Sequence, residues 1–316
     1  MGVFLQVRCR WMQVTGRVIY EQMREWYSHS GGEKMNHMIE VKHLLKNYGS
    51  VKAVEDISFY VEEGGLFAFL GPNGAGKSTT INMICTFLKP DGGSVQVDGF
   101  FLGKEDASIR ERIGVVFQNS VLDDLLTVEE NLLIRGNFYN LKGKVLKEAV
   151  KEAARATDLI DFLKRPYGKL SGGQRRRADI ARALIHTPRI LFLDEPTTGL
   201  DPQSRRSIWD TIKKLQAEQN MTVFLTTHYM EEAEDADYCI IIDDGRIAAK
   251  GTPMDLKGRY AKDKMRILLA ESGEAVNLKL ESTIEALDFL KTNEVDLILA
   301  DVKMPVMDGI TLLKKI

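Results

Sequence analysis

The stretch GPNGAGKST, residues 71–79, limits the possible folds of this chain more than any other segment. It follows the apolar run LFAFL and precedes a segment that carries Ile81, Ile84 and Leu88 at helical spacing. A strand, a glycine-rich loop and a helix in this order form a P-loop, in which backbone N–H groups and the helix N-terminus surround phosphates. The sequence therefore predicts an α/β protein that binds a nucleotide at this loop.

The residues of this loop have distinct predicted tasks. Lys77 is expected to reach the β- and γ-phosphates of ATP, and the Ser78 hydroxyl is expected to bind Mg²⁺. The other positions would line the phosphates with their backbone amides. The predicted nucleotide-binding residues of the loop are Gly71, Pro72, Asn73, Gly74, Ala75, Gly76, Lys77, Ser78 and Thr79.

Three other predicted strands end in polar side chains. Asp194 and Glu195 close the apolar run ILFLDE, so we expect Asp194 to hold Mg²⁺ and Glu195 to polarise a water against the γ-phosphate. His228 follows VFLTT and Gln118 follows IGVVF; we expect both at the same site, His228 as a γ-phosphate contact and Gln118 also as a metal contact. The alternatives are an acid pair that caps a loop and a lone histidine with a structural role.

The stretch LSGGQRRR, residues 170–177, predicts a second anion site. Ser171 is a predicted N-cap with Gln174 as its N3 partner, which leaves the amides of Gly172 and Gly173 free. The P-loop already surrounds the phosphates of its own nucleotide. The most economical ligand is therefore the γ-phosphate of an ATP held by a second copy, in a head-to-tail dimer that buries two ATPs.

The charge of the chain bears on nucleic-acid binding. The formal net charge is −2 at pH 7, with 43 Lys and Arg against 45 Asp and Glu. A chain without a basic excess has no general attraction for a phosphate backbone. We therefore expect the arginines at 175–177 to be solvated or salt-bridged, and we expect no nucleic-acid partner.

The pattern of apolar residues predicts two sheets. Alternating runs at 39–45 and 57–61 fit a partly exposed antiparallel sheet, and Asp244-Gly245 fits a hairpin turn. Other short runs are apolar throughout, which fits strands buried on both faces of a parallel sheet. These runs are 66–70, 190–193, 223–226 and 239–242.

Helix signals cluster in two places. Between residues 118 and 171 they begin with a capping box from Thr127 to Glu130, and they predict an inserted helical subdomain at about residues 119–178. Asp201 followed by Pro202 predicts the start of a later helix.

Together these motifs resemble the ATP-binding subunit of an ABC transporter over residues 38–260. The resemblance adds Tyr48 as an adenine-stacking residue and Asp201, in GLDP at 199–202, as a further nucleotide-binding residue. The stretches QNSVLDDLLTVEENL, EPTTGLDP, LTTHYMEEAEDAD and DGRIAAKGTP are similar to drug exporter ATPases of the daunorubicin-resistance type. The resemblance implies a P-loop NTPase fold with a mostly parallel core sheet, an antiparallel β subdomain and an inserted helical subdomain.

The resemblance also implies an activity and partners. Such a subunit hydrolyses ATP with Mg²⁺ and would drive export of a drug, lipid or similar amphiphile through a separate permease. The permease would dock beside Gln118. Through the permease, the chain would be cytoplasmic and peripheral on the inner face of the cell membrane. Two alternatives stay open: a soluble ABC ATPase that acts on nucleic acid or ribosomes, and an ABC ATPase regulated by its C-terminal tail.

Residues 1–34 are expected to lie outside the folded protein. Residues 31–34, GGEK, must be encoded by a purine-rich string just before Met35, which resembles a ribosome-binding site. We expect translation to begin at Met35 or Met38, and the alternative is a short disordered extension. The ABC ATP-binding domain is then predicted at residues 35–264.

The tail, residues 265–316, departs from the exporter ATPases. Its apolar runs predict a strand, a turn at Ser272-Gly273, a second strand, a helix capped by Ser282, a third strand and a final helix. The ending VDLILADVKMPVMDGITLLKKI resembles part of a response-regulator receiver domain with Asp301 at the phosphoacceptor position, and the close match begins at Ile284.

The segment before Ile284 allows a second interpretation. Residues 262–294 are also compatible with the small α/β appendage of exporter ATPases. A receiver needs an acidic pair on its first strand, and MRILLAESG offers only Glu271. We therefore expect a receiver-like fragment in this appendage.

Asp301 is expected not to accept a phosphoryl group. Phosphoryl transfer depends on groups that hold Mg²⁺ and stabilise the transferred oxygens, and Glu271 alone does not supply them. After incubation with acetyl phosphate and Mg²⁺, mass spectrometry should find Asp301 unlabelled, and Asp301→Ala should keep the wild-type ATPase rate. Stoichiometric, Mg²⁺-dependent labelling of Asp301 would contradict this and favour regulation by the tail.

Overall fold

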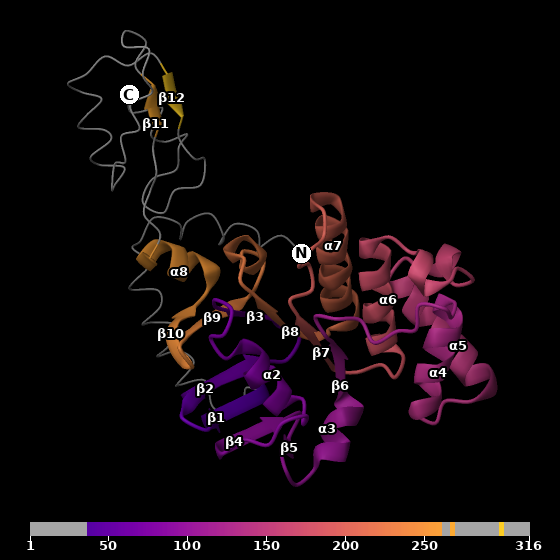
Figure 1. Cartoon of the computed structure of the whole chain (residues 1–316), viewed down its shortest axis with the longest axis horizontal. Coiled ribbons are helices and arrows are strands. Elements are labelled where there is room, and N and C mark those ends of the chain that lie inside the picture. The colour runs from indigo at the N-terminus through magenta and orange to yellow at the C-terminus, as the bar shows by residue number, and fades with distance from the viewer. Residues whose placement is uncertain (1–36, 261–265, 269–296, 300–316) are drawn as a thin grey trace, which may run out of the picture. The chain divides into compact units, whose positions relative to one another are not determined.

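The computed structural model describes residues 37–260, 266–268 and 297–299. Residues 37–260 form two sheets and a group of helices (Figure 1). The predictions for residues 1–34, for the turn at Ser272, for the helix cap at Ser282 and for Asp301 lie outside the described residues. The domain boundaries therefore stay predictions.

A six-stranded sheet forms the centre of the fold. Its order is β10-β9-β3-β8-β7-β6, and all neighbours are parallel except β10, which pairs antiparallel with β9. The four predicted buried strands are confirmed, each extended by at most one residue at either end. The bounds are β3 (Leu66–Leu70), β6 (Ile113–Val116), β7 (Ile190–Asp194), β8 (Thr222–Thr227), β9 (Tyr238–Asp243) and β10 (Arg246–Gly251).

The central strands are buried on both faces, which explains why they are apolar throughout. On β3, Leu66 and Leu70 belong to the hydrophobic cluster under the helices, whereas Phe67 and Phe69 belong to the cluster under the second sheet. Successive side chains of a strand point to opposite faces, so a strand between two layers must be apolar at every position.

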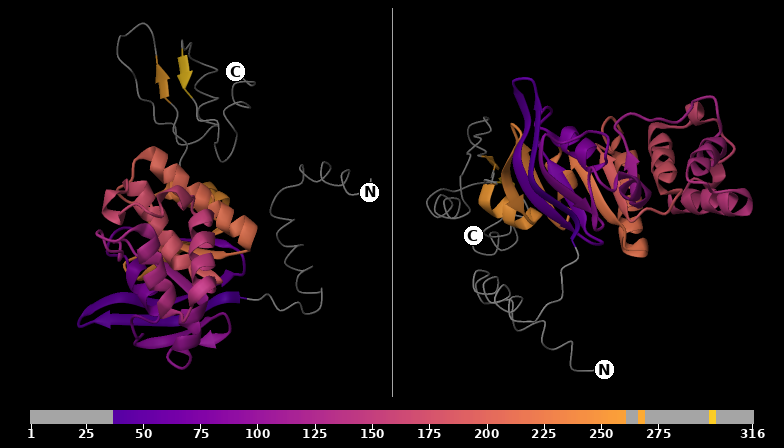
Figure 2. Two further views of the ribbon diagram at one scale, coloured as in Figure 1. Left: turned by 90° about the vertical axis from the view of Figure 1, so that its right-hand side faces the viewer. Right: turned by 90° about the horizontal axis from the view of Figure 1, so that it is seen from below.

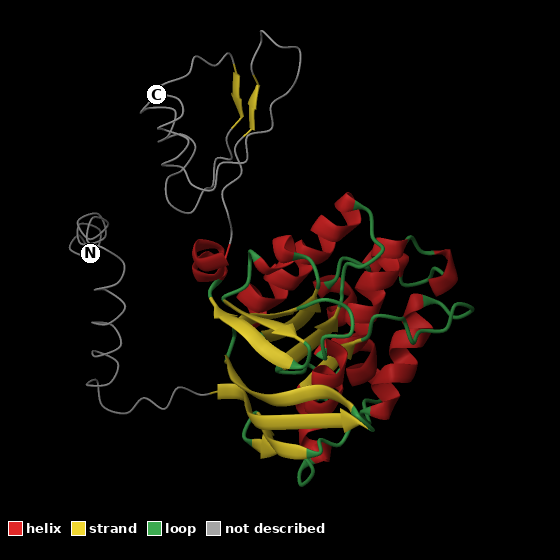
Figure 3. Ribbon diagram, turned by 60° about the vertical axis from the view of Figure 1, so that its left-hand side comes forward, coloured by secondary structure: helices red, strands yellow, loops and turns green. Residues whose placement is uncertain are grey.

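The second sheet is antiparallel, with the order β2-β1-β4-β5, and it stacks against the first (Figure 3). Its strands are β1 (His37–Tyr48), β2 (Val51–Glu62), β4 (Gly92–Val97) and β5 (Phe100–Phe101). β1 and β2 are longer than predicted because their exposed ends carry polar residues that broke the apolar pattern. The predicted hairpin between β9 and β10 is confirmed: Asp244 has a φ of 45° and Gly245 a φ of 75°, as a type I′ turn requires.

Helices α6 and α7 cover the other face of the central sheet, whereas α2 packs in the layer between the two sheets. Three predicted caps are confirmed: Thr127 and Ser171 each form a capping box, and Asp201 caps a helix with proline at its start. Helices α4 and α5 lie together beyond the β6 edge of the sheet (Figures 1 and 2). The helices are α2 (Lys77–Ile84), α3 (Asp106–Arg112), α4 (Val128–Phe138), α5 (Gly143–Ala156), α6 (Gly172–Leu184), α7 (Pro202–Gln219) and α8 (Pro253–Tyr260), with short 3-10 helices at η1 (Ile160–Phe162), η2 (Tyr167–Lys169) and η3 (Met230–Ala233).

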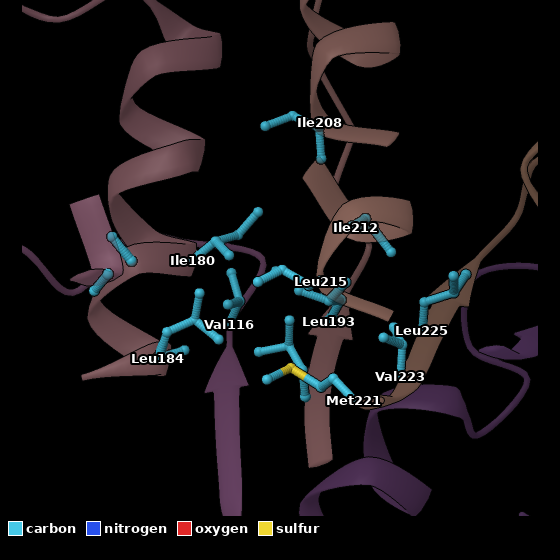
Figure 4. Packing of buried hydrophobic residues seen from close by; sticks show 14 of the residues in the cluster. Val116, Ile180, Leu184, Leu193, Ile208, Ile212, Leu215, Met221, Val223 and Leu225 are labelled. Atoms are coloured by element: carbon cyan, nitrogen blue, oxygen red, sulfur yellow. The ribbon is translucent and has the colours of Figure 1, made fainter. Parts of the chain in front are cut away.

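Helices α6 and α7 pack directly on the central sheet (Figure 4). Ile180 and Leu184 of α6 lie near Val116 of β6, and Ile212 and Leu215 of α7 lie near the ends of β7 and β8. None of the described helices is both long enough and apolar enough to span a bilayer.

In the tail, the structure describes one pair of short strands. β11 (Arg266–Leu268) pairs antiparallel with β12 (Leu297–Leu299). Both fall within strands that the sequence predicts.

The layer between the two sheets is held by an aromatic cluster around Phe224. Its ring centroid lies 4.9 Å from that of Phe67 and 5.3 Å from that of Phe192, and Phe224 is fully buried. Phe224→Ala should lower the free energy of unfolding by about 3–5 kcal/mol, because it removes buried area and leaves a cavity. Urea denaturation measures this change.

Phe101 offers a matched control, since its side chain is 45% exposed. Phe101→Ala should change the free energy of unfolding by about 0.5 kcal/mol or less. Equal effects of the two substitutions would contradict the role assigned to the cluster.

Candidate nucleotide-binding site

Parallel pairing brings three strand ends to one edge of the central sheet. Leu70, the last residue of β3, pairs with Thr227 of β8, and Asp194 of β7 pairs with Thr226. The chain therefore leaves these strands at neighbouring points, where the P-loop, Glu195 and His228 follow. This is the edge at which open α/β sheets bind ligands.

The P-loop needs glycine at two positions for lack of space. A Cβ atom on Gly71 would lie 2.3 Å from the carbonyl oxygen of Ile242, and one on Gly76 would lie 2.4 Å from that of Ala53. Gly76 also has a φ of 104°, which side chains other than glycine rarely adopt. The loop is thus pressed against β9 and β2, with its backbone free to face a ligand.

Lys77 points back over its own loop. Its side chain is 5% exposed, and Nζ donates hydrogen bonds to the carbonyl oxygens of Gly71 at 2.7 Å and of Pro72 at 2.9 Å. These hydrogen-bond partners are neutral, and the carboxylate of Glu195, 3.7 Å from Nζ, forms an ion pair with the ammonium group. An anion bound in the loop would add charge-assisted hydrogen bonds.

Asp194 and Ser78 lie close enough to share a small cation. Ser78 Oγ is 3.5 Å from Asp194 Oδ1, which also accepts a 2.6 Å hydrogen bond from Thr226 Oγ1. Carboxylate and hydroxyl oxygens suit Mg²⁺. Within the described ranges, no group of three His, Cys, Asp or Glu could hold a metal. The oxygens of Ser78 and Asp194 would fit a cation whose other ligands are phosphate and water.

Glu195 lies between the side chains of Lys77 and His228. Its Oε1 is 3.7 Å from Lys77 Nζ and 3.4 Å from His228 Nδ1, and Thr198 Oγ1 donates to Oε2 at 3.0 Å. The carboxylate is 11% exposed. The structure thus brings Lys77, Glu195 and His228 together, while their chemical roles stay predictions.

A cavity of about 250 Å³ opens over the P-loop. Gln118 lines it together with Glu195, although β6 ends at Val116, before the strand end that the sequence predicts. Tyr48 lies on β1, 51% exposed, with Lys46 Nζ 5.8 Å from its ring centroid. Lys46 thus lies over this ring, and Tyr48 is not among the residues that line the cavity.

Two groups of predicted residues lie apart from this cavity. Residues 171–174 form the start of α6, where Ser171 and Gln174 bond to each other in the capping box. Asp201 caps α7, and hydrogen bonds from Ser204 and Gln203 lower the pKa of its carboxyl group. Neither group contributes to the described wall of the cavity.

The starts of α6 and α7 are in close contact. A Cβ atom on Gly173 would lie 2.7 Å from Ser204 Oγ, and one on Gly172 would lie 3.3 Å from a methyl group of Leu200. Glycine is therefore needed at Gly173 for packing.

The prediction for the three arginines is wrong at Arg176. Arg175 is paired with Asp124 at 2.7 Å, as expected. Arg176 is instead 7% exposed, and its guanidinium donates to backbone carbonyls, including those of Asp194 and Glu195. Burial lowers the pKa of this group. The signal that was missed is helical spacing, because Arg176 shares one face of α6 with the buried residues Asp179 and Ala183.

Glu232 is a second buried residue that the sequence did not single out. It is 4% exposed, accepts a hydrogen bond from Thr197, and accepts another from Thr227 Oγ1 at 2.6 Å. It thereby ties the loop after Glu195 to the end of β8, which carries His228. In the sequence, Glu232 lies in the acidic run MEEAED, residues 230–235, which does not indicate that one of its side chains is buried.

Two family models match different parts of the chain. Residues 54–198 match the family model of the ABC transporter, and residues 259–316 match the response regulator receiver domain. The receiver resemblance is thus confirmed. It begins well before Ile284 and includes the segment for which an exporter appendage was the other interpretation.

Relatives match the larger part of the chain. The daunorubicin resistance ATP-binding protein DrrA3 of Streptomyces coeruleorubidus is 39% identical over 237 residues, which cover 75% of each chain. The linearmycin resistance ATP-binding protein LnrL of Bacillus subtilis is 43% identical over 240 residues, 75% of this chain and 76% of that protein.

A solved structure shows the same fold. A dimeric ATP-binding cassette in a post-hydrolysis state, bound to ADP and Pi, superposes with a TM-score of 0.62. It is 30% identical, and the match covers 68% of this chain and 99% of that chain. The chain therefore belongs to the ABC transporter family, among the ATP-binding subunits that hydrolyse ATP.

Proposed function

We propose that this chain powers an ABC exporter, which moves a drug, lipid or similar amphiphile through a separate permease on the inner face of the cell membrane. The observation that carries the proposal is the convergence of Lys77, Glu195 and His228 at the edge of the sheet where the P-loop begins. Similarity to two resistance proteins supports the direction of transport.

In this proposal the P-loop binds ATP through its backbone and Lys77. The ammonium group exchanges the carbonyl oxygens of Gly71 and Pro72 for phosphate oxygens, which gives it anionic partners. Mg²⁺ held by Ser78 and Asp194, with Gln118 at the cavity wall, would neutralise phosphate charge. Tyr48 would stack on the adenine.

Glu195 is the proposed general base. It would take a proton from a water aligned against the γ-phosphate, and His228 would hold the γ-phosphate and orient the carboxylate. The low exposure of Glu195 supports this role, because a buried site limits competing solvent and strengthens charge interactions.

The second anion site, residues 171–174, is proposed to act on a second copy of this chain. Its amides at the start of α6 lie outside the P-loop cavity, so they have no phosphate to bind within one copy. A head-to-tail dimer would place them, with Asp201 nearby, against the γ-phosphate of the partner's ATP. The dimeric cassette with ADP and Pi supports pairing of two copies.

The permease is proposed to dock at a pocket of about 870 Å³ between α3, α4 and α5. Its wall is apolar at Phe138, Leu141 and Val145, and Phe138 is 74% exposed. An apolar helix face would fit such a pocket. Helix α3 leads directly into β6, which ends two residues before Gln118. A movement of α3 on docking would therefore be transmitted to Gln118 through a single short strand.

Replacement of the base tests the chemistry. Glu195→Gln keeps the size of the side chain but cannot accept a proton, so ATPase activity should fall by about 10²–10⁴-fold. ATP binding should survive, and size-exclusion chromatography with ATP should show a trapped dimer. A Glu195→Gln chain that hydrolyses ATP at the wild-type rate would end the assignment.

Blockage of the second anion site tests the role of the partner copy. Ser171→Arg removes the cap and puts a bulky side chain before Gly172, so hydrolysis should be abolished while the monomer keeps its ATP affinity. Placed in the Glu195→Gln chain, Ser171→Arg should also prevent ATP-induced dimerisation. If that double variant dimerises like Glu195→Gln alone, residues 171–174 do not contact the partner's ATP.

A further inference from the structure

Arg176 is the most densely bonded buried cation described at the site. Nε donates to the carbonyl oxygen of Pro196 at 2.8 Å, and Nη1 donates to that of Phe117 at 2.5 Å. Nη2 donates to the carbonyl oxygens of Asp194 at 2.9 Å and Glu195 at 3.1 Å. Four of the five N–H groups of a guanidinium are thus used, all on backbone carbonyls.

Three of these carbonyls flank a strained residue. Glu195 has a φ of 45°, in the left-handed region that non-glycine residues seldom adopt. Such a conformation persists only where the surroundings hold it. The N–H of Glu195 also donates hydrogen bonds to the carbonyl and hydroxyl oxygens of Thr226, and its carbonyl oxygen accepts one from the N–H of Thr198. Arg176 therefore adds to these local bonds a contact from a separate helix, α6.

The rest of α6 is attached to the strand that leads to Gln118. Asp179 accepts a 2.6 Å hydrogen bond from Ser120 Oγ, and Arg182 Nη2 donates to the carbonyl oxygen of Val115 at 2.5 Å. Arg176 and Arg182 bond to the chain before Gln118, and Asp179 bonds to the chain after it. Helix α6 is therefore attached on both sides of Gln118. A shift of α6 would therefore move the backbone on which Gln118 and Glu195 are placed.

We propose that Arg176 is a positioning residue. It makes hydrolysis of the ATP at a chain's own P-loop depend on whether the start of the same chain's α6 contacts the ATP of the second copy. The inference rests on the proposed function, in which the start of α6 contacts the ATP of the second copy. When that ATP seats α6, Arg176 fixes the carbonyls around Glu195 in the geometry needed for proton transfer. The two ATP sites are thereby coupled through a single side chain in each copy.

The test compares Arg176→Gln, Arg176→Lys and the control Arg177→Gln in the full chain. Arg177 is the next residue of α6, and no hydrogen bond or ion pair of its side chain is found among the described residues. Arg176→Gln should lower kcat by about 10²-fold, because small displacements of catalytic groups cost that much. Its affinity for a non-hydrolysable ATP analogue should not change.

The dependence of the rate on ATP concentration reports the coupling. The wild type and Arg177→Gln should show a sigmoidal dependence, and Arg176→Gln should show a hyperbolic one. Arg176→Lys keeps the charge but has three N–H donors on one atom, so its kcat should lie between the two and should test the proposal even if the Gln variant fails to fold. A hyperbolic wild type, or an Arg176→Lys chain with wild-type kcat and a sigmoidal dependence, would overturn the proposal.

A second measurement separates positioning from simple support of α6. In the Glu195→Gln chain, addition of Arg176→Lys should leave ATP-induced dimerisation unchanged, because the start of α6 still binds the partner's ATP. Loss of the dimer in parallel with the loss of kcat would overturn the proposal. If Glu195→Gln itself does not dimerise with ATP, the proposed function fails and not only this inference.

Discussion

The parallel pairing of β3, β8 and β7 determines where the chemistry of this protein lies. Because these strands run in the same direction and in register, the chain leaves all three at one edge of the sheet. The P-loop, Glu195 and His228 are each the first residues beyond that edge. Their approach within 3.7 Å follows from the sheet, and the aromatic layer beneath the sheet keeps the strands in place.

Two successive turns of helix α6 differ in character, and this gives the helix two proposed tasks. At its start the capping residue Ser171 and Gly172 are exposed, which suits an anion supplied from outside the chain. One turn further on, Arg176 places a positive charge among carbonyl dipoles of its own catalytic loop. A buried charge without such partners would be costly, so its position and that of the loop depend on each other.

Much of the fold and the site could be predicted from the sequence, for reasons that particular residues illustrate. Leu66–Leu70 was recognisable as a doubly buried strand, and Thr127, Ser171 and Asp201 as caps, because these signals are local. The grouping of Lys77, Glu195 and His228 was also predictable, since it follows from strand direction alone. Arg176 and Glu232 were not, because their burial depends on which elements pack against them, and their bonds go to distant residues.

In the proposed mechanism each ATP lies between the P-loop of one copy and the start of α6 of another. The most direct test is a crystal structure of the Glu195→Gln chain with ATP and Mg²⁺. We expect a head-to-tail dimer in which the γ-phosphate lies within hydrogen-bond distance of Lys77 of one copy and of Ser171 of the other. A nucleotide bound at the P-loop with no contact to residues 171–174 of a second copy would contradict it.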